Sequence, residues 1–314
     1  MSETTTKGNY MGSNNLLVRF WGVRGSHPVP GQNTIRFGGN TSCIEVRAKN
    51  HIIILDAGTG IVNLGARLLK EINGAESPFF ITLLFSHTHY DHIQGLPFFA
   101  PAYNPNCVLN MYGPKSVSEN LDQVLATTLH PQYNPVELEE MAAQININNI
   151  NENQILVFAD SSKAPTVLPK NGHPRNSGKD VVVRLMRSYA HPKVGVTAFR
   201  IELNSKSVVY ATDTEGYVGN DMRLIEFSKN ADLLIHDAQY DLQEYLDPVF
   251  PKQGFGHSTY EMAAEVAKAA RVKTLVLFHH DPGHDDQKLA DMEAKTRELF
   301  PNSTAGAEGL EFTF

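Results

Sequence analysis

The segment from His87 to His92 carries four side chains able to bind metal within six residues, and it follows the apolar run from Ile81 to Phe85. The four side chains are those of His87, His89, Asp91 and His92. An apolar run that ends in imidazoles and a carboxylate predicts a buried strand with a functional loop at its end. Histidines two positions apart do not share a face of a helix, but on an extended or tightly turned segment they can converge on one cation. Asp91 and His92 then point toward a second cation.

Cysteine is nearly absent from this chain, which contains only Cys43 and Cys107. Two cysteines are too few for a disulfide scaffold or a cysteine-rich zinc ribbon, and they fit a reducing compartment. A carboxylate paired with imidazoles, without a nearby thiolate, suits zinc or manganese. We therefore predict a cytoplasmic protein with a histidine and carboxylate metal site.

Apolar, β-branched runs recur along most of the chain and predict strands. They lie at residues 16–20, 43–46, 52–55, 79–85, 108–111, 181–185, 194–201, 208–210, 233–235 and 274–278. Helical periodicity appears at residues 61–72, 117–129 and 262–270. Strands interleaved with helices predict an α/β fold in which sheets are covered by helices.

No change of composition divides the chain, so we predict one domain over residues 16–314. Residues 1–15 are polar and predict a disordered leader without a signal sequence. Residues 163–179 are rich in Pro, Gly, Asn and basic side chains and predict a long surface loop. No segment has the roughly 18 to 20 consecutive apolar residues of a membrane span, so no membrane partner is expected.

Six residues cannot complete two coordination spheres, so further ligands must lie at other strand ends. His191 follows the run 181–185, Asp213 follows 208–210, and His279 follows 274–278. Each of these residues alone would more often be structural. Their shared position at strand ends makes them candidate ligands.

The order of these residues resembles the five-motif dinuclear site of the metallo-β-lactamase superfamily, whose fold is an αββα sandwich. The likeness extends from about residue 16 to 280. It implies two divalent ions, Zn²⁺ or alternatively Mn²⁺, that share a hydroxide. It implies a first metal held by His87, His89 and His191, a second held by Asp91, His92 and His279, and Asp213 as the bridge. Asp91 would also orient the hydroxide.

His257 precedes a helix whose start we assign to Ser258, with Glu261 completing a capping box. A helix and a returning strand fit between His257 and His279 and would bring His257 back over the metals. This His-Ser-Thr segment resembles the phosphodiesterase branch of the superfamily, which includes ribonuclease Z and the bacterial and phage cyclic-nucleotide phosphodiesterases. The resemblance implies that His257 is catalytic and assists at the phosphate.

Two departures separate the chain from ribonuclease Z. Bacterial ribonuclease Z carries a long tRNA-gripping arm between the His and Asp motifs, whereas His191 and Asp213 are close in this sequence and two strands fill the interval. In ribonuclease Z, an acidic residue three positions before the bridging Asp also supports the catalytic histidine. This chain has Tyr210 at that position. Glu215 or Asp237 is the candidate replacement.

The net charge of −7 disfavours binding of a whole tRNA. We therefore predict a metal-dependent phosphoric diester hydrolase that opens a 3′,5′-cyclic nucleotide such as cAMP or cGMP by attack of the hydroxide. A ribonuclease Z-like endonuclease that processes RNA or tRNA 3′ ends is the first alternative, and a lactam, lactone or thioester hydrolase is the second. The branch resemblance also implies a homodimer.

Several further residues have candidate supporting roles. Asp56 begins a turn after the run 52–55, and we predict that its hydrogen bonds support the neighbouring metal loop. Arg24, Ser26 and His27 follow the first strand and either line the pocket or serve the fold. The sequence identifies no substrate-binding residue.

Overall fold

The structure is a computed structural model, and it describes residues 15–74, 78–115, 119–160, 162–172, 179–216 and 221–314. Apart from residue 15, the predicted leader 1–15 lies outside these residues. Within the described ranges, no helix is long and apolar enough to cross a membrane.

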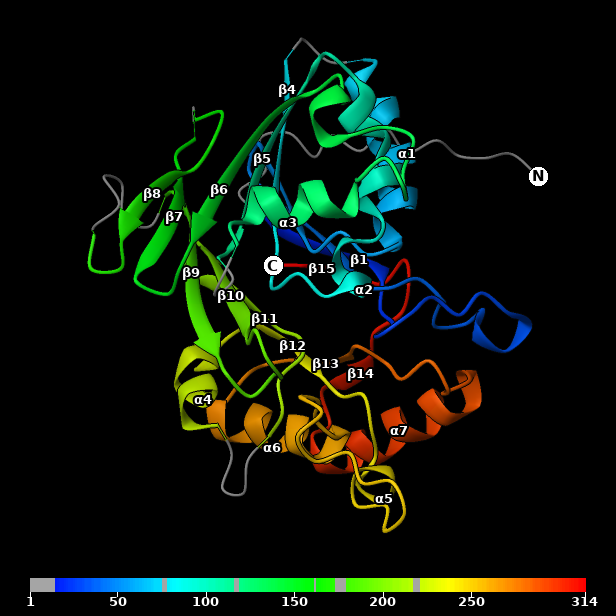
Figure 1. Cartoon of the computed structure of the whole chain (residues 1–314). Coiled ribbons are helices and arrows are strands. Elements are labelled where there is room, and N and C mark those ends of the chain that lie inside the picture. The colour runs from blue at the N-terminus through cyan, green and yellow to red at the C-terminus, as the bar shows by residue number, and fades with distance from the viewer. Residues whose placement is uncertain (1–14, 75–77, 116–118, 161, 173–178, 217–220) are drawn as a thin grey trace, which may run out of the picture.

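Two mixed sheets make up the centre of the molecule (Figure 1). The first has the order β15-β1-β2-β3-β4-β5-β6, and the second has the order β14-β13-β12-β11-β10-β9-β7-β8. The strands of the first sheet are β1 (Leu16–Gly22), β2 (Cys43–Ala48), β3 (His51–Leu55), β4 (Phe79–Leu84), β5 (Cys107–Pro114), β6 (Gln144–Ile150) and β15 (Glu311–Thr313). Those of the second are β7 (Gln154–Phe158), β8 (Thr166–Pro169), β9 (Val181–Ser188), β10 (Val196–Leu203), β11 (Lys206–Ala211), β12 (Leu233–Asp237), β13 (Leu275–Phe278) and β14 (Ser303–Ala305).

Helices cover the outer faces of both sheets, as Figure 1 shows for α1 and α3 on one side and for α4, α6 and α7 on the other. The α-helices of the described residues are α1 (Gly60–Ile72), α2 (Tyr90–Ile93), α3 (Leu121–Thr128), α4 (Met222–Ser228), α5 (Leu242–Tyr245), α6 (Tyr260–Ala270) and α7 (Asp286–Leu299). In α1 the residues at helical spacing, such as Ile61, Leu64 and Leu68, are fully buried against the first sheet. The periodicity of the sequence therefore predicts the covered face correctly.

The main core lies between the two sheets. Phe20 and Ile44 of the first sheet pack with Phe199, Ile201 and Phe278 of the second in one fully buried cluster. Two further clusters lie beneath the helices on the outer faces. Helices outside and two sheets inside confirm the α/β fold with covered sheets, in the αββα layering that the superfamily resemblance implies.

Parallel strand pairs bring several carboxyl ends to one edge of the sandwich. β11, β12 and β13 are parallel neighbours, as are β3, β4 and β5. Residues that follow parallel strands emerge at the same edge of a sheet, where α/β proteins bind their ligands. His87, Asp213 and His279 all follow such strands.

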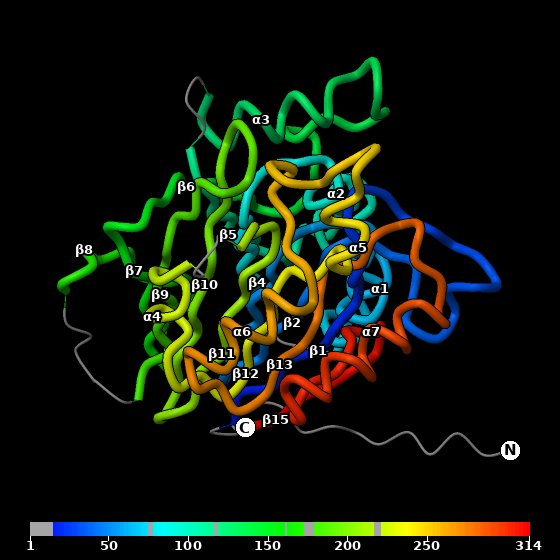
Figure 2. The backbone as a smooth tube through the Cα atoms, turned by 90° about the horizontal axis from the view of Figure 1, so that it is seen from below, coloured from blue at the N-terminus to red at the C-terminus, as the bar shows by residue number. Residues whose placement is uncertain are grey.

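The predicted surface loop at 163–179 is only partly a loop. Residues 166–169 form β8, which pairs antiparallel with β7. β8 lies at the outer edge of the second sheet, away from β13 (Figures 1 and 2). Residues 173–178 lie outside the described residues. The range therefore contributes a short strand to a β-hairpin, and the basic residues Lys163 and Lys170 lie on either side of that strand.

Candidate metal centre

The loop after β4 delivers the first four candidate ligands. His89 caps the short helix α2 and has extended backbone angles, while Asp91 and His92 lie within the helix and are buried. The backbone N–H of Ala57 donates to the carbonyl of His92, and the N–H of Asp56 donates to Leu84 at the end of β4. Of the two conformations that the spacing allows, the segment is extended at His89 and turns into a short helix directly after it. Neighbouring backbone holds this helix in place.

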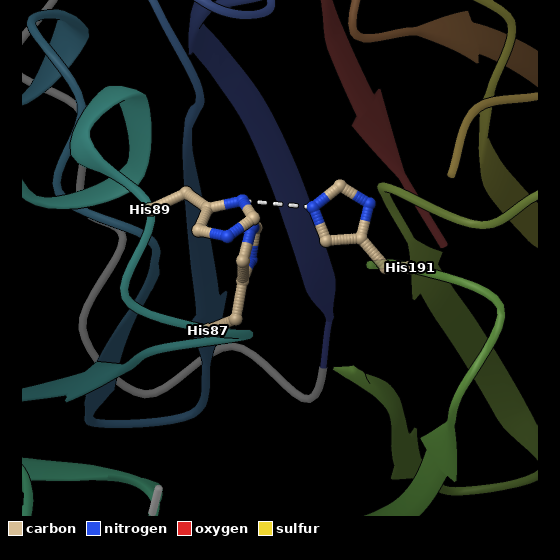
Figure 3. A group of neighbouring side chains, drawn as sticks. All are labelled: His87, His89 and His191. Carbon is tan, nitrogen blue, oxygen red and sulfur yellow. Dashed lines mark hydrogen bonds between the residues drawn. The ribbon is translucent and has the colours of Figure 1, made fainter. Parts of the chain in front are cut away.

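A three-histidine group is formed by His87, His89 and His191, whose rings face one another (Figure 3). His89 Nδ1 lies 2.8 Å from His191 Nε2. The ring centroids of His87 and His191 are 4.8 Å apart. Residues more than a hundred positions apart thus present imidazole nitrogens to one point.

The ring nitrogens of this group are oriented by the surrounding protein. His87 Nδ1 lies 3.1 Å from the Ser86 hydroxyl, and His191 Nδ1 donates to the Gly256 carbonyl at 3.2 Å. His87 Nε2 is buried and has no hydrogen-bond partner among the described residues. A buried nitrogen without a partner is costly unless a cation takes its lone pair, so the group fits a metal ion.

A carboxylate group is formed by Asp91, His92, Asp213 and His279, all of which are buried. His279 Nε2 lies 3.0 Å from Asp91 Oδ2, and His92 Nε2 lies 3.2 Å from Asp213 Oδ2. The two Nε2 atoms of His92 and His279 are 3.3 Å apart. Two imidazoles and two carboxylates around one point form a donor set suited to zinc or manganese.

Asp213 lies between the two groups. Its Oδ1 is 3.7 Å from both His87 Nε2 and His191 Nε2, and its Oδ2 faces His92 and His279. One carboxylate therefore reaches both groups, at the position where the resemblance implies a bridging residue. Each of its oxygens faces a different cluster of imidazole nitrogens.

Local backbone strain accompanies this arrangement. Asp213 and His279 have φ values of 52° and 61°, and Asp56 has a φ of 61°. These left-handed conformations are unfavourable for residues other than glycine and persist where the surrounding structure enforces them. Asp56 and His279 directly follow β3 and β13, and Asp213 lies two residues after the end of β11. The turns at these strand ends therefore point the side chains into the site.

Asp56 is the hydrogen-bond hub beneath the site. Its carboxylate accepts bonds from the Ser86 N–H, the Ser86 hydroxyl, the Tyr210 hydroxyl and His92 Nδ1 at 2.7 to 2.8 Å. The supporting role predicted for Asp56 is confirmed. Tyr210 occupies the position at which ribonuclease Z has an acidic residue. Its hydroxyl donates to Asp56 rather than to His257.

The pKa values separate the two groups. Burial lowers the pKa of His191 to about 4 and that of His87 well below its ordinary value. Burial opposes protonation of His279 as well, but Asp213 and Asp91 raise its pKa to about 9. Burial would raise the pKa of Asp213, yet the neighbouring histidines hold it well below its usual range. The carboxylate group therefore stabilises positive charge, whereas the three-histidine group keeps neutral imidazoles.

His257 lies beside both groups without belonging to either. Its ring centroid is 4.9 Å from that of His279, in a stacked arrangement, and 5.2 Å from that of His191. Its Nδ1 lies 2.8 Å from Asp237 Oδ2. Of the two acids considered from the sequence, Asp237 is therefore the partner of His257.

The helix start after His257 differs from the prediction. Thr259, not Ser258, caps α6, and its side chain accepts a bond from the Met262 N–H. Ser258 instead donates its hydroxyl to the Thr214 carbonyl, while its N–H donates to Asp237. The capping-box assignment is wrong because Ser258 and Thr259 have the same capping chemistry in sequence, and only the backbone angles separate them.

Glu215 holds the segment in front of His257. Its carboxylate accepts bonds from the N–H groups of Gly254 and Gly256 and from the Tyr245 hydroxyl, at 2.6 to 2.8 Å. Because the Gly256 carbonyl in turn accepts from His191, Glu215 supports a metal-site histidine as well as the His257 segment. Its proximity to Asp213 in the sequence is the only signal that could have suggested this role.

Sequence reasoning missed Gln239. Its side-chain oxygen lies 3.0 Å from His279 Nδ1, and its N–H donates to Asp237. Ser26 contributes through its backbone, because its N–H donates to Asp91 Oδ2 at 2.7 Å. Neither a glutamine after a strand nor a backbone N–H carries a pattern that sequence reading recognises.

Arg24 and His27 do not line the site. Arg24 is fully buried, and its guanidinium donates to the carbonyls of Gly38, Asp281 and His284, so it joins distant loops. His27 is exposed and its ring contacts the Pro28 carbonyl. Of the three residues considered after the first strand, only Ser26 reaches the centre.

A family model described as the beta-lactamase superfamily domain matches residues 51–280, which include every candidate ligand. The chain belongs to the metallo-β-lactamase superfamily. A ribonuclease Z of Picrophilus torridus is 28% identical, with 94% of each chain covered, and a ribonuclease Z of Pyrococcus furiosus is 25% identical, with 92% of each covered. These relatives assign the chain to the phosphodiesterase branch, as the sequence predicts.

Solved structures show the same fold. The metallo-β-lactamase fold protein YhfI of Bacillus subtilis has a TM-score of 0.64 at 18% identity, covering 96% of this chain and 100% of its own. Human tRNase Z, short form, has a TM-score of 0.59 at 20% identity, covering 94% and 98%. Zn²⁺-bound PqqB of Methylobacterium extorquens has a TM-score of 0.60 at 16% identity, covering 94% and 99%.

The predicted fold and enzyme class are confirmed. The chain is a metal-dependent phosphodiester hydrolase of the metallo-β-lactamase superfamily. Its fold and its buried histidine and aspartate cluster imply divalent metal ions at the site edge.

Proposed function

We propose that this enzyme uses two divalent cations, most simply Zn²⁺, to hydrolyse phosphodiester bonds of nucleotides or RNA. The observation that carries the proposal is His257, an imidazole bound to Asp237 and stacked on His279 at the edge of two candidate metal groups. A lactamase-type reaction has no need of this additional imidazole. A phosphodiester has a leaving oxygen that needs a proton and oxygens that gain negative charge.

His87, His89 and His191 would hold one cation, and Asp91, His92 and His279 would hold the other, with Asp213 reaching both. When bound, such a pair lowers the pKa of water toward ~7 and neutralises charge on phosphate oxygens. Mn²⁺ has the same ligand preferences and is the alternative. The structure of Zn²⁺-bound PqqB supports zinc in a chain with this fold.

Asp237 fixes the orientation of His257. Because Asp237 accepts the Nδ1 hydrogen, Nε2 is the nitrogen left to face substrate. From there it can donate a hydrogen bond to a phosphate oxygen or a proton to the leaving oxygen. Asp91, whose Oδ2 accepts from the Ser26 N–H, is the proposed carboxylate that orients the attacking water.

RNA is the first candidate substrate. The relatives that align over nearly the whole chain are named ribonuclease Z, and the human structure with this fold is a tRNase Z. Processing at an RNA 3′ end requires the same hydrolysis of a phosphodiester. The relatives therefore favour an RNA substrate over the cyclic nucleotide predicted first from the sequence.

A 3′,5′-cyclic nucleotide such as cAMP or cGMP is the second candidate, and the hairpin of β10 and β11 favours it. These two strands pair antiparallel from Phe199 with Tyr210 to Leu203 with Lys206 and account for most of the chain between His191 and Asp213. No tRNA-gripping arm can occupy this interval. The net charge of −7 also provides little general attraction for a large RNA.

One comparison of substrates tests both candidates. Enzyme loaded with Zn²⁺ or Mn²⁺ is incubated with a tRNA precursor carrying a 3′ extension, and separately with cAMP and cGMP. Cleavage of the precursor alone identifies an RNA 3′-processing enzyme, and hydrolysis of the cyclic nucleotides alone identifies a cyclic phosphodiesterase. Hydrolysis of a lactone or thioester that survives His257→Ala, with neither phosphodiester cleaved, would overturn the proposal.

The predicted homodimer and cytoplasmic location belong to this proposal. A dimer would offer an RNA substrate basic side chains from a second subunit. Light scattering coupled to gel filtration measures the mass of the assembly, and a value near that of one 34.8 kDa chain would remove the dimer from the proposal.

A further inference from the structure

The segment between α5 and His257 presents an aromatic platform, which we define as Phe250, Lys252 and Phe255. The side chains of Phe250 and Phe255 are 59% and 43% exposed. Their ring centroids are 5.8 Å apart and their planes meet at 83°. Lys252 Nζ lies 4.1 Å from the Phe250 centroid and 5.7 Å from that of Phe255. Exposing two phenyl rings to water is unfavourable, and exposed rings beside a cation are typical of a binding surface.

The platform is fixed to the catalytic segment. Lys252 donates its backbone N–H to the Tyr245 carbonyl, and Phe255 donates its own to the Lys252 carbonyl. Glu215 binds the N–H groups on both sides of Phe255. The backbone that carries the rings is therefore held in place relative to His257, only two residues beyond Phe255.

Neighbouring side chains connect the platform to the site through Tyr240. Lys252 Nζ lies 5.8 Å from the Tyr240 ring, and that ring is 6.1 Å from the ring of His257. Lys252 forms no ion pair within 4 Å among the residues that the structure describes, although two backbone N–H groups and its charge lower the pKa of the Asp247 carboxyl. The Lys252 ammonium can therefore contact a phosphate without first leaving a salt bridge.

We propose that the platform binds an unpaired nucleobase of the substrate, stacked on Phe250 or Phe255, while Lys252 contacts an adjacent phosphate. This inference rests on the proposed function, since it assigns a base-bearing substrate to the same site. Phenyl rings stack on any base without reading its sequence, and a cation beside them meets the negative backbone. The platform therefore selects nucleotides and single-stranded RNA over diesters that lack a base.

Two chromogenic diesters measure the effect of the base. Thymidine 5′-(4-nitrophenyl phosphate) carries a nucleobase, methyl 4-nitrophenyl phosphate does not, and both release 4-nitrophenolate. Phe250→Leu and Phe255→Leu keep apolar bulk and remove the ring. The double variant should raise KM for the thymidine ester about 5- to 150-fold, the range of one stacked base, and leave kcat and the methyl ester unchanged.

Val249→Ala is the matched control, because Val249 is 89% exposed in the same segment but has no ring. It should leave both substrates unaffected, and thermal unfolding should give each variant a midpoint close to the parent's. Equal losses on both esters, or no loss on the thymidine ester, would overturn the platform.

A binding measurement separates this inference from the proposed function. Calorimetry with 5′-AMP and with ribose 5-phosphate compares ligands that differ only in the base. Selective loss of 5′-AMP binding in the double variant supports the platform even if the parent enzyme cleaves neither ester, an outcome that sinks the proposed function alone. Equal binding of the two ligands by the parent contradicts the platform even if both esters are cleaved.

Discussion

The three-histidine group and the carboxylate group lie side by side but differ in charge and in support. The first consists of neutral imidazoles, of which His191 faces the Gly256 carbonyl and His87 faces the Ser86 hydroxyl. The second contains two buried carboxylates, and its histidines are held by the side chains of Asp56 and Gln239. Carboxylates add charge attraction for a divalent cation, and rigid partners reduce the cost of organising the site. The carboxylate group should therefore retain its metal more firmly.

Removing Asp213 should have the largest effect, because its two oxygens face both groups. Asp213→Asn keeps the shape but lowers the charge shared by the two cations. Activity should fall well beyond the roughly 10- to 100-fold that loss of an outer hydrogen-bond partner costs, and the metal content should drop at both positions. Elemental analysis of dialysed protein and kcat/KM measure the two effects. Full metal content in this variant would contradict a shared ligand.

The pair His191→Ala and His279→Ala separates the two groups. His191→Ala should leave about one metal per chain, because the carboxylate group remains intact. His279→Ala should weaken the firmer group and lower total metal further at the same chelator concentration. Titration with a chelator, followed by elemental analysis, ranks the two variants, and the reverse ranking would refute the difference in retention.

Substitutions at two glycines test the same difference between the two groups. They would crowd a ligand histidine instead of removing it. A Cβ at Gly256 would lie 2.4 Å from His191 Nδ1, and a Cβ at Gly25 would lie 2.4 Å from the His279 ring. Gly256→Ala and Gly25→Ala should each lower kcat/KM about 10- to 100-fold, since displacements near 1 Å have costs of this size. Gly256→Ala should release metal from the three-histidine group first.

Gly254→Ala is the control for backbone conformation. Gly254 has a φ of 81°, close to the 90° of Gly256, but a Cβ there meets nothing within 4 Å. A cost from positive φ alone should therefore appear in both variants as reduced stability. If Gly254→Ala loses as much metal as Gly256→Ala, crowding of His191 is not the cause.

The contrast between the groups also explains how much of the site could be predicted from the sequence. His87 to His92 are a local motif, and the strands before His191, Asp213 and His279 are strong β patterns, so fold and candidate ligands could be read directly. The supporting atoms could not. The Gly256 carbonyl and the Ser26 N–H belong to the backbone, which has no sequence signature, and Gln239 is one polar residue after a strand. Ser258 and Thr259 have the same capping chemistry, so the sequence alone does not show which of them begins the helix.

Glu244 gives the smallest effect and tests the outer support of the carboxylate side. Its carboxylate lies 2.8 Å from His284 Nε2, and the His284 carbonyl accepts from Arg24, next to Gly25. Burial would raise the pKa of Glu244, but His284, the Asp241 N–H and Lys288 lower it to about 2. A lowered folded-state pKa stabilises the protein above the ordinary value and loses that stability as pH falls toward 2.

Glu244→Gln should therefore reduce the free energy of unfolding at pH 7 by only about 0.5 to 1 kcal/mol, because water screens this partly exposed carboxylate. The difference from the parent should persist at pH 6 and shrink below pH 4.5, where an unfolded Glu takes up a proton. Urea unfolding at pH 7 and pH 3 measures both values. Unchanged metal content in Glu244→Gln would show that Glu244 does not support metal binding. Selective loss of metal from the carboxylate group would instead mean that metal retention there depends on residues as distant as Arg24.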